Sequence, residues 1–154
     1  MEYPPTALVG RLPIGATPER DAISELIGNT TLKTLCTATD GSTKVYLGIK
    51  PQDTTRPYIL VARDRREHEY GSCGGMAGIS ETKIGVVITV VDEHYQRCMD
   101  LETLVLQSLE NKATPNVRRW SLASTEYPSD ILDDSTGRAV YNAVLSFQCE
   151  MRSG

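Results

Sequence analysis

A glycine-rich stretch with a cysteine and a nearby histidine holds the residues of this sequence whose types could do chemistry. The stretch EYGSCGGMAG runs from Glu69 to Gly78 and directly follows His68. Glycines let backbone N–H groups approach a phosphate, a thiol beside an imidazole can act as a nucleophile, and both groups can bind a metal ion. Each chemistry needs further residues at a fixed spacing, which the sequence can be checked for.

The known phosphate-binding motifs are incomplete in this stretch. The glycines stand at Gly71, Gly74, Gly75 and Gly78, and no Lys-Ser or Lys-Thr pair follows them. A dinucleotide fingerprint needs GxGxxG at the start of a helix, whereas the residues after Gly78 have the composition of a strand. Because no helix N-terminus supplies N–H donors, we expect neither phosphate binding nor a cofactor.

Metal binding and nucleophilic catalysis also lack the residues they need. A zinc site uses three or four converging ligands, but the only histidines are His68 and His94, and the four cysteines form no CxxC or CxxH pair. Catalysis by Cys73 with a histidine base would need a third group to orient the base. We therefore expect no catalytic or metal-binding residues and a protein that is not an enzyme. A small cysteine-dependent hydrolase or transferase using Cys73 is the alternative from a different class.

The helices expected to surround this stretch are marked by caps and by periodic apolar residues. Thr17 and Pro18 are typical of a helix start and Gly28 of a helix end, and a second short helix is expected over residues 30–37. The clearest helix covers residues 92–111, with Asp92 as its N-cap. Its buried stripe, widened by Leu104, is predicted from residues three or four apart: Tyr95, Cys98, Leu101, Val105 and Leu109.

Five strands are expected, over residues 44–49, 58–63, 83–91, 118–125 and 139–152. The segment 83–91 is almost continuously apolar, which is typical of a central strand covered on both faces. The segment 139–152 alternates strictly, which predicts one face on the core and one polar face. This order predicts an α+β fold: a mostly antiparallel sheet with one long helix packed on one face and a short N-terminal helix.

Size and charge limit the class of protein. The 154 residues fit one domain, and the net charge of -4 argues against a domain that binds nucleic acid through a basic face. No apolar run approaches the roughly 20 residues of a membrane helix, and the N-terminus does not have the pattern of a secretory signal. We therefore expect a soluble protein that is intracellular when made.

Two segments are candidates for contacts with other proteins. Residues 1–17 are predicted to form an extended arm, packed on its own domain or on a neighbouring subunit, before a single domain over residues 18–154. The apolar residues of this candidate inter-subunit arm are Leu8, Val9, Leu12 and Ile14. Residues 64–82 form a long connection, and the charged run at residues 63–70 is either a solvated hairpin extension or a contact with a ring or partner. The candidate contact residues of the segment 63–82 are Arg63, Arg65, Arg66, His68, Tyr70, Cys73 and Met76.

The sequence resembles the tail-terminator, or tail-completion, proteins of long-tailed bacteriophages. The resemblance begins in VYLGIKPQDTTRPYILV (residues 45–61), where a short strand, a turn with proline and a PY pair follow one another. It continues through residues 83–91 and 101–109, and ends where DDSTGR precedes YNAVLSFQCEM. These loose patterns cover about residues 21–151, and the arm departs from the shorter members of the family.

The resemblance implies a structural virion protein of the head-proximal end of the tail, made in the host cytoplasm. Such subunits form a hexameric ring that caps the tail tube and takes part in head-tail joining. The implied partners are other copies of the chain, the tail tube protein and a head-tail connector or head-completion protein, with no membrane. DNA passes through the ring without being read, and an acidic subunit suits such a passage. Another head-tail connector or a tail-tube component is the alternative within this class.

Overall fold

A computed structural model describes residues 17–52, 54–69, 83–132 and 139–152, with the backbone alone for residues 65–69 and 127–132. The helices are α1 (Pro18–Gly28), α2 (Thr30–Leu35) and α3 (Tyr95–Leu109). The strands are β1 (Val45–Leu47), β2 (Tyr58–Glu69), β3 (Lys83–Asp92), β4 (Val117–Leu132) and β5 (Ala139–Met151). The predicted α+β class and order of elements are confirmed.

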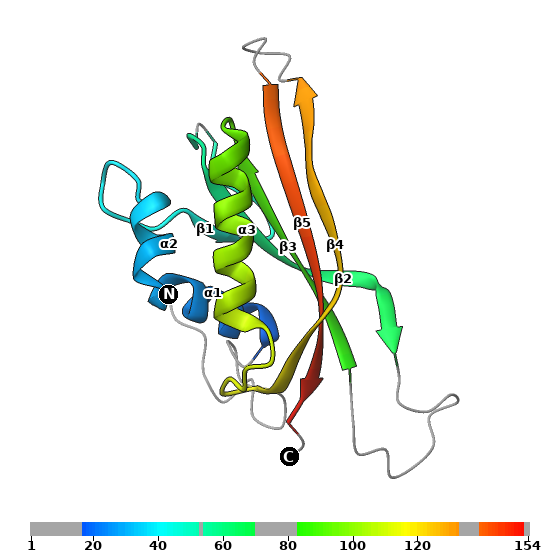
Figure 1. The fold of residues 1–154 in the computed structure, drawn as a ribbon. Coiled ribbons are helices and arrows are strands. Elements are labelled where there is room, and N and C mark those ends of the chain that lie inside the picture. Colours follow the sequence, from blue (N-terminus) through cyan, green and yellow to red (C-terminus); the bar gives the residue numbers. More distant parts are fainter. Residues whose placement is uncertain (1–16, 53, 70–82, 133–138, 153–154) are drawn as a thin grey trace.

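The described strands form one five-stranded sheet in the order β1-β2-β3-β5-β4. All neighbouring strands are antiparallel except β1 and β2, which run parallel. The predicted central position of β3 is confirmed, because it pairs with β2 on one side and with β5 on the other. The three helices lie together on one face of the sheet, with β1 and β4 at its two edges (Figure 1).

The main core lies between these helices and the sheet. Leu26 of α1 and Leu32 of α2 are fully buried in it, together with Val86, Ile88 and Val90 of β3. The predicted alternation of β5 is confirmed, since Ala143, Leu145, Phe147 and Cys149 are buried while the residues between them are only partly so. The ring of Trp120 meets that of Phe147 edge-on, with 5.9 Å between their centres.

The first helix begins as its sequence predicts. The Thr17 hydroxyl accepts a hydrogen bond from the N–H of Arg20 at 3.3 Å, and Pro18 occupies the first turn. Asn29 then caps α2, because its side-chain oxygen accepts from the N–H of Leu32 at 3.1 Å. None of the described helices is long and apolar enough to cross a membrane.

The start of α3 differs from the prediction. The N-cap position is His94 rather than Asp92, and no side chain caps the helix there. Tyr95 is 47% exposed instead of buried, and its ring packs edge-on against Tyr141. The helix therefore begins later than the sequence pattern suggests. The remaining members of the predicted stripe are fully buried: Cys98, Leu101, Val105 and Leu109.

Two strands are longer than predicted because bulges interrupt their patterns. β2 continues to Glu69, so the connection expected over residues 64–82 begins six residues later in the described backbone. The pairing moves from Asp64 opposite Gly85 to His68 opposite Ile84, which leaves residues 65–67 of β2 without counterparts on β3. β4 continues to Leu132 instead of ending near residue 125, through three register shifts against β5.

Candidate functional site

The structure describes the predicted contact residues to different extents. Arg65, Arg66 and His68 lie in the last part of β2, where only the backbone is described. Tyr70, Cys73 and Met76 lie outside the described residues, as do all four apolar residues of the arm. The predicted contact role of these residues stays a prediction.

Arg63 has a defined partner within its own chain. Its Nε atom donates to Glu19 Oε2 at 3.0 Å, and its Nη2 atom donates to Glu19 Oε1 at 2.8 Å. This two-point contact joins β2 to the first turn of α1, which directly follows Thr17 in the chain. In the described structure Arg63 therefore makes a packing contact within its own subunit.

The described cysteines are not arranged for catalysis. Cys36, Cys98 and Cys149 are buried and form no disulfide. Burial raises the pKa of the Cys36 thiol to about 11 and that of Cys98 to about 12, and it raises the pKa of Cys149 further still. Because the thiolate is the reactive form, these three groups act as small apolar side chains. No three His, Cys, Asp or Glu side chains in the described segments are placed to hold a metal ion.

A buried carboxylate, Asp21 of α1, holds the turn before β4. It accepts from the Thr114 hydroxyl at 2.7 Å, from the Asn116 N–H at 2.7 Å and from the Asn116 side-chain amide at 2.8 Å. Thr114 also accepts from the indole N–H of Trp120 at 3.0 Å. Since these polar groups satisfy one another, they fix the loop rather than leave groups directed at a ligand.

A second charged group joins the end of β3 to the start of α3. The Asp92 carboxylate is fully buried and receives two bonds from Arg97, at 2.6 and 2.7 Å. Asp92 Oδ1 also accepts the N–H groups of Glu93 and His94. Glu93 itself accepts from Arg56 at 2.7 Å. Asp92 therefore links the end of β3 to α3 through Arg97, which is a different role from the predicted N-cap.

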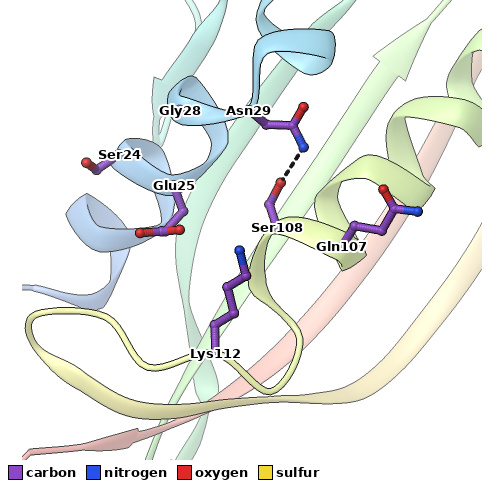
Figure 2. Close-up of a pocket in the computed structure, with 7 residues that line it drawn as sticks. All are labelled: Ser24, Glu25, Gly28, Asn29, Gln107, Ser108 and Lys112. Carbon is purple, nitrogen blue, oxygen red and sulfur yellow. Dashed lines mark hydrogen bonds between the residues drawn. The ribbon is translucent and has the colours of Figure 1, made fainter.

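A polar hollow lies between the end of α1 and the end of α3 (Figure 2). In it, the Asn29 amide donates to the Ser108 hydroxyl at 2.9 Å, and that hydroxyl donates to the Leu104 carbonyl. Glu25 and Lys112 also line it, together with the hydroxyl groups of Ser24 and Ser108, but the lining holds no histidine, no cysteine and no second carboxylate. The hollow has no set of residues suited to catalysis, so it is not the best candidate for function.

The exposed apolar residues point instead to protein contacts. The large apolar side chains exposed in the described structure are Leu47, Ile49 and Tyr95, with exposed fractions of 47%, 73% and 47%. Two of these lie at β1, one edge of the sheet. Sequence reasoning missed them because it treated residues 44–49 as an ordinary strand. The signal in the sequence was the glycine at position 48. In the structure Gly48 has a positive φ of 80°, and β1 ends just before it.

The face of the sheet away from the helices carries a smaller apolar cluster. Tyr58, Val91 and Val140 are buried there, with Tyr46 and Leu60 partly buried around them. Asn142 is the register partner of Val91, and its buried side-chain oxygen has no hydrogen-bond partner among the described residues. This face therefore combines apolar side chains with one buried acceptor that the described structure leaves unsatisfied.

Comparison with known proteins gives a likeness of fold. No protein-family model matches the chain, and no curated protein sequence matches it. Among solved structures, the fold is similar to that of a chain in the virion of a native gene transfer agent particle. The TM-score is 0.64 at 12% identity, and the likeness covers 99% of this chain and 100% of that chain. At this identity the likeness establishes a shared fold.

Proposed function

We propose that this chain is a structural protein of a phage-like virion. The observation that carries the proposal is the coverage of the fold likeness, which takes in 99% of this chain and 100% of the virion chain. The likeness therefore takes in nearly all of both chains and is not limited to a shared part. The described polar clusters agree with a structural role, because the carboxylates of Asp21 and Asp92 accept hydrogen bonds from other residues of the same chain.

Within that class, the proposed role is that of a tail terminator. The subunits form a hexameric ring that caps the tail tube and joins it to the head through a connector or head-completion protein. The residues that carry the sequence resemblance, 45–61, include β1, the following turn and the start of β2. In this proposal the segment that begins beyond Arg63 contacts the lumen or the adjoining ring, and residues 1–17 serve as an arm before one domain.

The acidic character of the chain suits passage of DNA through such a ring. The net charge of -4 makes tight, sequence-independent binding to phosphates unfavourable. DNA would then pass through the lumen without being held by the subunit. The virion is the proposed location of the protein, at the head-proximal end of the tail.

Imaging of the purified chain tests this proposal. Negative-stain microscopy and light scattering are expected to find closed single rings that do not grow with concentration. A tail-tube component would instead form long polymers, and a purely monomeric protein at all concentrations would contradict the ring. A Cys73→Ser variant is expected to give the natural yield of infectious particles, which would remove the cysteine-dependent enzyme. Loss of a measurable enzymatic activity in that variant would support the enzyme instead.

A further inference from the structure

The outer edge of β1 is an exposed strand edge with apolar side chains beside it. β1 stands at the end of the strand order, so in the described structure it pairs with β2 alone. Leu47 and Ile49 are 47% and 73% exposed there. We refer to these two residues as the β1 strip. Strand edges with nearby exposed apolar groups are templates for pairing with another chain.

The backbone at this edge offers one donor and one acceptor to a further strand, because the Val45 N–H already donates to the Thr43 carbonyl and the Leu47 carbonyl already accepts from Ile49. The N–H of Ile59 donates to the Lys44 carbonyl at 2.9 Å, and the N–H of Gly48 donates to the Val61 carbonyl at 2.8 Å. Residues 44, 46 and 48 therefore face β2, and by alternation Val45 and Leu47 direct their backbone groups away from it. The N–H of Leu47 and the carbonyl of Val45 thus lie on the outer side of the sheet.

The chain has one segment with the composition to occupy this edge. Residues 1–16 lie outside the described part and join it at Thr17. The stretch TALVGRL, residues 6–12, contains no proline, so each of its residues can donate a backbone hydrogen bond. In an extended chain Leu8, Leu12 and Ile14 fall on one side. Sixteen extended residues reach about 50 Å, far enough to contact another subunit.

We propose that residues 6–12 of one subunit add as a strand to the outer edge of β1 in the neighbouring copy, with Ile14 continuing along it after Pro13. Leu8, Leu12 and Ile14 then cover the β1 strip of that copy. This inference rests on the proposed ring, because a head-to-tail ring needs two different complementary surfaces on each subunit. The arm and the β1 edge form such a pair, joined by strand addition.

Two variants separate the donor from the acceptor. The first lacks residues 2–16 and keeps the β1 strip, and the second carries Leu47→Ser with Ile49→Ser and keeps the arm. Each is expected to remain monomeric when alone, because one of the two surfaces is missing. An equal mixture is expected to form a one-to-one heterodimer that grows no further, measured by light scattering coupled to size exclusion. Tyr95→Ser removes the third exposed apolar side chain and is expected to form rings as the natural chain does.

The outcomes distinguish this inference from the ring itself. If either variant forms rings alone, or if their mixture forms no heterodimer, the arm does not dock on a neighbour and the inference is overturned. If the natural chain forms no ring, the proposed function has failed first. Ile49→Lys, at a side chain 73% exposed, repeats the test should the double serine variant unfold.

Discussion

At the scale of single residues, the buried thiols are expected to lower the stability of the fold at alkaline pH. The Cys36 thiol has a pKa of about 11 in the folded chain against 9.0 for an unperturbed thiol, because burial disfavours its charged form. Below pH 9 the thiol is protonated in both states. Above it, the unfolded chain loses the proton first, so rising pH favours unfolding.

We therefore expect the free energy of unfolding to fall between about pH 9 and 11. The slope contributed by each thiol is at most about 1.4 kcal/mol per pH unit. Urea unfolding at a series of pH values, in a Cys73→Ser background, measures it. Cys36→Ala provides the comparison, because its curve should fall less steeply over the same range. Equal slopes in the two proteins would show that Cys36 is not the source.

The residues that could be predicted from the sequence are those whose roles follow from a local pattern. Cys98 and Cys149 lie in regular apolar stripes, and both are fully buried. The hydrogen bonds of Asp21 were not predictable, because Thr114 and Asn116 are more than ninety positions away in the chain. The same applies to Leu47 and Ile49, whose exposure depends on β1 being an edge strand.

At the scale of elements, the joint between β3 and α3 depends on a buried ion pair. The Asp92 carboxylate is fully buried, whereas 34% of the Arg97 side chain is exposed. Arg97→Met would leave that carboxylate with backbone N–H groups as its described donors. We expect the variant to lose about 2 kcal/mol of unfolding free energy, since a buried charge would lose its charged partner.

A surface pair provides a matched control for Arg97. Arg118 and Glu150 form a salt bridge at 3.1 Å, with 52% and 25% of their side chains exposed. Arg118→Met is expected to cost less than about 1 kcal/mol, because solvent screens exposed pairs. Urea unfolding of both variants gives the comparison. Losses of the same size would mean that burial of Asp92 does not strengthen its pairing.

The order and type of the elements could be predicted from the sequence, but the lengths of the strands β2 and β4 could not. β3 and β5 have uninterrupted patterns, so their positions were close to those observed. β2 and β4 continue beyond their predicted ends, through the irregularities that follow Asp64 and Glu126. A bulge shifts which residues face the core, so a two-residue period breaks in the sequence while the strand continues in the sheet.

At the scale of the whole molecule, we expect that part of the segment between β2 and β3 can be removed without loss of the fold. The last described pair before it is Glu69 opposite Lys83, and residues 72–78 fall between these two positions in the chain. Their deletion is expected to change the unfolding temperature by only a few degrees, because loop closure depends weakly on length. The same deletion is expected to impair joining of tails to heads, measured by particle yield.

A replacement of the same length shows whether an effect of that deletion comes from the lost side chains or from the shortened segment. Replacement of residues 72–78 by alternating glycine and serine keeps the reach of the segment and removes Cys73 and Met76. Loss of joining in both variants would assign the contact to side chains, whereas loss in the deletion alone would assign it to length. An insoluble or unfolded deletion variant would show that the segment is structural.

Residues 65–67 of β2 have no register partners on β3. This bulge separates the residues that set the strand geometry from those of the proposed contact segment. Because the pairing resumes with His68 opposite Ile84, the direction in which the hairpin leaves the sheet is set by this bulge and not by the residues beyond it. A change of one residue within the bulge would turn His68 and Glu69 to opposite sides. Substitutions beyond Glu69 leave that geometry alone. The scaffold and the proposed contact segment can therefore diverge independently over evolution, so that the segment can be exchanged as a module.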